Sequence, residues 1–218
     1  MNRRAEVLAE MGIAPVWRLR ARKEEAATRE EQGVAGWIPL KALVSGCTRC
    51  ALHQTRTQTV FGVGDENADW MLIGEAPGAE EDRLGDPFVG QAGKLLDNML
   101  AALGLSRREN VYIANVLKCR PPGNRNPSPD EVEKCSPHLL QQIELIKPKL
   151  IVAMGRFAAQ TLLKTDASIS SLRGRLHRYA GVPLIVTYHP AYLLRTLEDK
   201  AKAWEDLVFA KKTMAGLG

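Results

Sequence analysis

The sequence predicts an α/β fold built on a four-stranded parallel sheet with helices on both faces. Two observations lead to this prediction. Four short apolar runs, the first beginning at residue 69, have the length and composition of buried parallel strands. Expected helices alternate with them along the chain. The 218 residues, 45% of them hydrophobic, suffice for one domain with a substantial core plus an extension.

The expected elements follow one another from residue 69 to residue 214. The strand candidates are DWMLIG (69–74), VYIANVL (111–117), LIVAMG (150–155) and PLIVTYH (183–189). The expected helices cover residues 91–103, 129–146, 156–164 and 197–214. In such a sheet, the loops that carry function lie at the carboxyl ends of the strands.

The start of the second of these helices can be predicted residue by residue. Ser128 suits the N-cap, Pro129 suits the first helical position, and Glu131 completes a capping box. Further along, Pro137 removes a backbone donor and disfavours helical geometry at the residue before it. We therefore expect the helix to kink or restart there, which would leave the Cys135 thiol free to face a ligand.

Residues 1–36 are expected to form an N-terminal helical and charged extension, and residues 37–218 the main domain. The extension begins with a short amphipathic helix and continues in VWRLRARKEEAATREEQG, whose mixed charges indicate a solvated helix or linker. The first residues lack the apolar run of a secretory signal, and the longest apolar stretches are too short to cross a membrane. We therefore expect a cytoplasmic protein without a membrane partner.

All four cysteines of the chain lie beside turns or expected helix ends. They are Cys47, Cys50, Cys119 and Cys135. The C-T-R-C pair can present two thiolates to one centre, and the other two cysteines lie far away in sequence. The alternatives are two disulfides, which need an oxidising compartment, or four unrelated core cysteines. A metal centre is favoured, and spacing alone leaves structural zinc and an iron-sulfur cluster both open.

Polar residues accompany three of the expected strands at their carboxyl ends. Glu75 follows the first strand, Asn115 lies within the second, and His189 comes at the end of the fourth. Taken singly, each has an ordinary structural role, as a helix cap, a satisfied core amide or a buried histidine. Their shared position at one edge of a parallel sheet predicts a site.

The formal charge of +5 permits a nucleic-acid partner without establishing one. Basic residues gather in RGRLHR (173–178) and around Cys119. Such runs are as often a solvated face as a phosphate-binding surface, so the charge pattern alone leaves both interpretations open.

Three motifs together resemble those of the family 4 uracil-DNA glycosylases. They are GEAPGAEEDRLGDPFVGQAGKLL, NVLKCRPPGNRNP and HPAYLLR. The resemblance spans about residues 40–212 and includes all four cysteines. It implies the three-layer αβα fold of the uracil-DNA glycosylase superfamily and a structural four-iron four-sulfur (4Fe-4S) cluster held by the cysteines. It also implies that the protein flips deoxyuridine out of single- or double-stranded DNA and hydrolyses its N-glycosidic bond.

The resemblance further implies roles for individual residues. Phe88 would stack on the flipped uracil. The Asn115 amide would accept a hydrogen bond from uracil N3–H and donate one to O4, a pattern that cytosine presents in reverse. His189 would bind uracil O2 and stabilise the leaving anion, while Glu75 would position or activate the attacking water.

Further predictions concern selectivity and DNA contacts. Gly78 stands where related enzymes carry a bulky aromatic, so Glu81 is the candidate to meet the C5-methyl group of thymine. Leu193 and Leu194 are candidates for a wedge that fills the gap left by the flipped base, with ordinary packing as the alternative. Phosphate contacts are expected from three arginines, Arg173, Arg175 and Arg195.

Two other functions stay open at this point. The first is a DNA-binding or replication-associated module that keeps the fold without turnover, and the second is a relative that acts on other deaminated bases. A branch that forms a covalent adduct with uracil DNA carries a histidine-bearing loop after the second strand. It is set aside because KCRPPGNRNPSPDE contains no histidine. A monomer is expected.

Overall fold

The computed structural model describes residues 36–217. The amphipathic helix and the charged segment expected in the N-terminal extension lie outside the described residues. The proposed division of the chain at residue 36 therefore stays a prediction.

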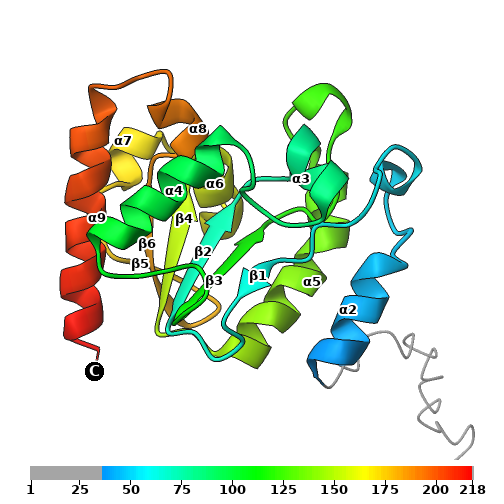
Figure 1. Cartoon of the computed structure of the whole chain (residues 1–218), viewed down its shortest axis with the longest axis horizontal. Coiled ribbons are helices and arrows are strands. Elements are labelled where there is room, and N and C mark those ends of the chain that lie inside the picture. Colours follow the sequence, from blue (N-terminus) through cyan, green and yellow to red (C-terminus); the bar gives the residue numbers. More distant parts are fainter. Residues whose placement is uncertain (1–35, 218) are drawn as a thin grey trace, which may run out of the picture. The chain divides into compact units, whose positions relative to one another are not determined.

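A six-stranded sheet forms the centre of the described domain (Figure 1). Its middle is parallel and contains the four expected strands, in the order β3 (Val111–Asn115), β2 (Trp70–Gly74), β4 (Leu150–Met154) and β6 (Val182–Thr187). Two short antiparallel strands that were not predicted flank this core, β1 (Val63–Gly64) beside β3 and β5 (His177–Tyr179) beside β6. The predicted four-stranded parallel sheet is thus the inner part of a larger sheet.

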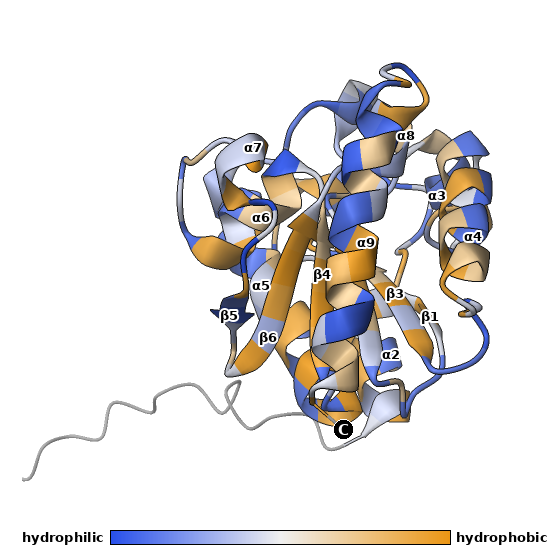
Figure 2. Cartoon of the chain, turned by 90° about the vertical axis from the view of Figure 1, so that its left-hand side faces the viewer, coloured by the Kyte–Doolittle hydropathy of each residue, from blue (hydrophilic) through white to orange (hydrophobic). Residues whose placement is uncertain are grey.

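Side chains alternate between the two faces of the sheet, and each face is covered by helices. On one face, Met71 and Ile73 belong to a cluster with α5 (Pro129–Ile146), α6 (Arg156–Leu163) and α7 (Ile169–Leu172). On the other, Trp70 and Leu72 pack in a cluster with α4 (Gln91–Ala102) and α9 (Asp199–Ala215). The strands are accordingly largely hydrophobic, as Figure 2 shows for β4 and β6. This arrangement is a three-layer αβα fold.

The remaining elements are short or peripheral. Helix α2 (Trp37–Ser45) contacts α5, while α3 (Ala79–Leu84) and α8 (Pro190–Leu193) lie toward the carboxyl ends of the strands (Figure 1). Two 3-10 turns, η1 (Ala51–Gln54) and η2 (Pro122–Asn124), follow the second and third cysteines. Within residues 36–217, no helix combines the length and hydrophobicity needed to span a bilayer.

Helix α5 begins as predicted and then differs from the prediction. The Ser128 hydroxyl accepts a hydrogen bond from Glu131 N (3.3 Å), and the Glu131 carboxylate accepts one from Ser128 N (2.8 Å). The expected restart at Pro137 is wrong, because one helix continues to Ile146. A proline removes only one donor, whereas the residues after it, such as Leu139, are buried against the sheet. Packing therefore outweighs the local preference.

The order of the strands locates a crevice. The chain that leaves β2 leads to β3 on one side, whereas the chain that leaves the neighbouring strand β4 leads to β5 and β6 on the other side, so the connections after β2 and β4 depart in opposite directions. In open α/β sheets, ligands bind outside the carboxyl ends of strands at such a switch point. Glu75 directly follows β2, and Asn115 ends β3.

Candidate active site and cysteine centre

A pocket of about 420 Å³ opens at the carboxyl ends of β2 and β3. The structure brings five of the predicted base-site residues together in its lining, namely Glu75, Glu81, Phe88, Asn115 and His189. They come from three separate parts of the chain, as the positions at the strand ends predict. Arg195 also lines this pocket.

The Asn115 amide is placed by the register of the sheet. Asn115 pairs with Gly74 across β3 and β2, and it is only 2% exposed. A Cβ atom at position 74 would lie 2.4 Å from Asn115 Oδ1, so only glycine leaves room for the amide. Among the described residues Oδ1 has no hydrogen-bond partner. A buried acceptor left unpaired costs about 1–3 kcal/mol, and a ligand N–H would relieve that cost.

His189 caps helix α8 and is held in one tautomer. Its Nδ1 accepts a hydrogen bond from Ala191 N at 3.1 Å, so the neutral ring carries its proton on Nε2. Burial lowers the pKa of His189 to about 4, with Arg195 acting in the same direction and Glu81 opposing. At neutral pH the side chain is therefore an uncharged donor through Nε2–H.

Phe88 occupies a backbone conformation that is unusual for a large side chain. Its φ is 55°, in the left-handed region, and its ring stacks on His189 with centroids 5.4 Å apart. Arg107 donates to the carbonyl oxygens of Pro87 (3.2 Å) and Phe88 (3.0 Å). Such backbone strain costs about 1–3 kcal/mol and persists where the surroundings impose it. Arg107 thus fixes the backbone that carries Phe88, and no sequence motif indicates this role.

The Glu75 carboxyl group is half-buried at the pocket. Burial raises its pKa, and the positive charge of Arg156 partly opposes that shift. Glu75 and His189 also line an adjoining hollow of about 440 Å³, together with Arg156 and Tyr188. Arg156 is the first residue of α6, and no sequence motif indicates its place beside Glu75.

The Glu81 carboxylate holds the loop around the pocket. It accepts hydrogen bonds from the backbone N–H groups of Gly78 (3.1 Å) and Val89 (3.1 Å). A Cβ atom on Gly78 would lie 2.7 Å from Glu81 Oε2. Glu81 therefore occupies the space that a side chain at position 78 would take, and at the same time fixes the backbone next to Phe88.

One of the predicted DNA contacts, Leu193, is wrong, and a second, Arg173, is engaged in contacts within the protein. Leu193 is 1% exposed and packs with Tyr188 and Ala203, so it belongs to the core and is unavailable as a wedge. The Arg173 guanidinium pairs with the buried Asp206 at 2.7 Å and lies 5.0 Å from the centroid of the Tyr188 ring. This ion pair connects Arg173, the residue after α7, to helix α9. Two other predicted contacts are exposed, Leu194 and Arg175.

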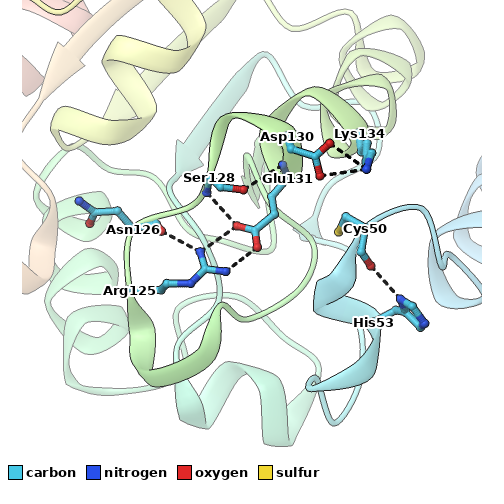
Figure 3. A network of polar contacts seen from close by, with 8 residues as sticks. All are labelled: Cys50, His53, Arg125, Asn126, Ser128, Asp130, Glu131 and Lys134. Atoms are coloured by element: carbon cyan, nitrogen blue, oxygen red, sulfur yellow. Dashed lines mark hydrogen bonds and ion pairs between the residues drawn. The ribbon is translucent and has the colours of Figure 1, made fainter.

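The loop between β3 and α5 forms another wall of the pocket and is braced by one arginine (Figure 3). Arg125 donates to both oxygens of Glu131, at 2.9 and 2.6 Å, and to the Asn126 carbonyl at 3.0 Å. The Arg125 guanidinium holds the pKa of the Glu131 carboxyl below its usual value. The same glutamate that caps the helix thus orients the loop, which a capping motif alone does not predict.

The four cysteines surround one small cavity and form no disulfide. Two N–H groups donate to sulfur atoms, from Arg56 Nη1 to Cys119 Sγ at 3.0 Å and from Lys118 N to Cys135 Sγ at 3.3 Å. The His138 Nε2 atom lies 3.4 Å from Cys47 Sγ. Burial raises the pKa of the Cys135 thiol to about 11. The structure therefore brings together the residues that the spacing of the cysteines assigned to one centre.

Comparison with known proteins identifies the family of this chain. The model of the uracil DNA glycosylase superfamily matches residues 61–208. A type-4 uracil-DNA glycosylase of Archaeoglobus fulgidus is 50% identical over 159 residues, which cover 69% of this chain and 79% of the relative. A type-4 uracil-DNA glycosylase of Thermotoga maritima is 45% identical over 172 residues, or 77% of this chain and 89% of the relative. A type-5 uracil-DNA glycosylase of Pyrobaculum aerophilum is 35% identical over 146 residues, or 60% and 64%. The chain therefore belongs to the uracil DNA glycosylase superfamily and, within it, to the type-4 enzymes.

Proposed function

We propose that this protein flips deoxyuridine out of DNA and hydrolyses its N-glycosidic bond. The reaction releases uracil and leaves an abasic site, the first step of base excision repair. The observation that carries the proposal is a complementary pair of groups in one pocket: the unpaired Asn115 Oδ1 and the neutral His189 ring with its proton on Nε2. Uracil offers an N3–H donor to the first and an O2 acceptor to the second.

The base is selected through the Asn115 amide. Oδ1 accepts from uracil N3–H while the amide nitrogen donates to O4. Cytosine offers an acceptor at N3 and a donor at N4, so both groups would be left buried and unpaired, a penalty that gives strong discrimination. Phe88 supplies an aromatic face for the base. Against thymine, the Glu81 carboxylate stands in place of a side chain on Gly78, where it restricts the space for a C5-methyl group.

Cleavage of the N-glycosidic bond places negative charge on the base and positive charge on the sugar, and the enzyme must stabilise both charges. The His189 Nε2–H group stabilises the negative charge that develops on uracil O2, in the manner of an oxyanion hole, without transferring its proton. Glu75 holds the water that attacks C1′ and stabilises the positive sugar. The hydroxyl of that water joins C1′, and its proton passes to the Glu75 carboxylate, from which it reaches the departing base or the medium. The raised pKa of Glu75 suits a group that receives a proton.

The four cysteines suit a 4Fe-4S cluster with a structural role. The donor set is four thiols; two of them accept N–H hydrogen bonds and a third lies beside an imidazole nitrogen, an environment that suits an iron-sulfur centre. Within residues 36–217, no three Cys, His, Asp or Glu side chains are grouped closely enough to ligate a single ion. The four cysteines line a single cavity, and this is the observation that supports one shared centre. The cluster would tie the segment before η1 to the loop that carries Arg125.

DNA contacts the residues around the opening of the pocket. Arg195 lines the opening, and Arg175 and Leu194 are exposed, so they remain the candidates for phosphate contacts and for a wedge. We propose that the enzyme acts as a monomer and that its substrates are single- and double-stranded DNA containing uracil. We propose a cytoplasmic enzyme, because a reducing compartment keeps the four cysteines available as thiolate ligands.

The proposal is tested with a labelled oligonucleotide that carries one uracil, and with alkali to cut any abasic site. The wild-type protein is expected to produce strand breaks with uracil and none with cytosine. His189→Ala is expected to lower the rate by about 10²–10³-fold, since it removes one donor to the developing anion. Binding of the DNA without base release would refute the glycosylase proposal and favour a binding module.

A further inference from the structure

Among residues 36–217, the largest of the fully buried side chains is a lysine, Lys118. It is 1% exposed and lies between the two sites, three residues after Asn115 and one before Cys119. Among the described residues its ammonium group forms no ion pair with a carboxylate. Burying an unpaired charge is expensive, so a lysine in this position needs a specific set of partners.

Its partners connect the base pocket to the cysteine centre. Lys118 Nζ donates to the backbone carbonyl of Asn115 at 2.9 Å and to Gln142 Oε1 at 2.6 Å. The backbone N–H of the same lysine donates to Cys135 Sγ at 3.3 Å. Gln142 is itself fixed, because its Nε2 donates to the Phe61 carbonyl at 2.9 Å. One residue thus contacts both the strand end that reads the base and a cysteine of the centre.

We propose that Lys118 is a positioning residue that couples the cysteine centre to the uracil pocket. This inference rests on the proposed function. The ammonium group holds the Asn115 carbonyl and so fixes the end of β3, from which the Asn115 amide projects. The amide oxygen has no hydrogen-bond partner among the described residues, so its position depends on the backbone that carries it. A lysine that served only to balance charge near the sulfur atoms would not need this contact.

The test combines two changes, Lys118→Met and Asn115→Ala, in a double-mutant cycle. Methionine has a similar length and keeps the backbone N–H, but it lacks the charged donor. Single-turnover base release from uracil DNA is expected to fall about 10- to 100-fold in Lys118→Met. In the Asn115→Ala background the same change is expected to have little further effect, because Lys118 acts through Asn115. Iron content and thermal unfolding are measured on every variant.

The matched control is Lys134→Met. Lys134 lines the same cysteine cavity, but it is half-exposed and pairs with Asp130 at 2.8 Å. It is expected to keep the wild-type rate and iron content. Should Lys118→Met fail to fold, Gln142→Met replaces it in the cycle, because it removes one of the two acceptors of the ammonium group and leaves the lysine in place. The expected loss is smaller and again disappears in the Asn115→Ala background.

Two results would overturn the inference. One is a Lys118→Met protein with normal iron content and the wild-type rate. The other is a loss that appears in full in the Asn115→Ala background, which would show that the lysine acts independently of the amide. Either result leaves the proposed function intact as long as the wild-type protein releases uracil and Asn115→Ala weakens its discrimination against cytosine.

Discussion

Adding one methyl group at Gly74 is expected to disable the pocket while leaving the fold intact. An alanine Cβ would lie 2.4 Å from Asn115 Oδ1 and 2.7 Å from Phe88 Cζ, whereas ordinary contacts begin at 3.4 Å. At least one of these side chains must therefore move by about 1 Å, and a misplacement of that size lowers a rate by about 10²-fold. Overpacking a core destabilises a protein by about 1–3 kcal/mol, which most domains tolerate.

The assay is single-turnover cleavage of a uracil oligonucleotide by Gly74→Ala, with chemical denaturation to confirm folding. Gly46→Ala is the matched control, since its Cβ would meet the nearest atom, Ala42 O, at 3.6 Å, an ordinary contact. We expect the control to cleave at the wild-type rate. A folded Gly74→Ala protein with the wild-type rate would show that the amide and the aromatic ring do not hold the base as described.

Three further changes test other parts of the account. Arg107→Met removes the donors to the Pro87 and Phe88 carbonyls, so the strained backbone relaxes and single-turnover cleavage is expected to fall about tenfold; an unchanged rate would contradict this. Because burial raises the pKa of Glu75, kcat/KM is expected to fall as the pH drops through that raised value, and Glu75→Gln is expected to have a low rate without this acid limb. Leu193→Ala is expected to lower the free energy of unfolding by about 2–5 kcal/mol, whereas Leu194→Ala changes it by less than about 0.5 kcal/mol. Equal effects of the two leucine changes in denaturation would contradict the placement of Leu193 in the core.

The inner sheet could be predicted because its signals are local. Each parallel strand is buried on both faces and forms a short apolar run, and a capping box marks the start of α5. The edge strands carry no such signal. Strand β1 has two residues, and β5 is His-Arg-Tyr, which looks like part of a basic run. Pro137 was misleading because the packing of the following residues decides whether the helix continues.

The residues that line the pocket could be predicted from the sequence, but the residues that hold them in place could not. Polar residues at strand ends indicate a pocket, since parallel strands share an edge. The roles of Lys118 and Arg107 depend on hydrogen bonds to backbone carbonyls, which leave no trace in the sequence. The error at Leu193 has the same origin, because an exposed and a buried leucine look alike in a motif and only packing distinguishes them. The ion pair of Arg173 with Asp206 of α9 likewise depends on packing and has no signal in the sequence.

The central claim is that this pocket releases uracil from DNA, and the most direct measurement detects the free base. Purified protein with its iron content determined is mixed with DNA that carries uracil, cytosine or thymine at one position, and the small products are quantified by mass spectrometry. We expect one free uracil for each abasic site and neither free cytosine nor free thymine. Abasic sites without free uracil, or release of thymine at a similar rate, would contradict the assignment of the pocket.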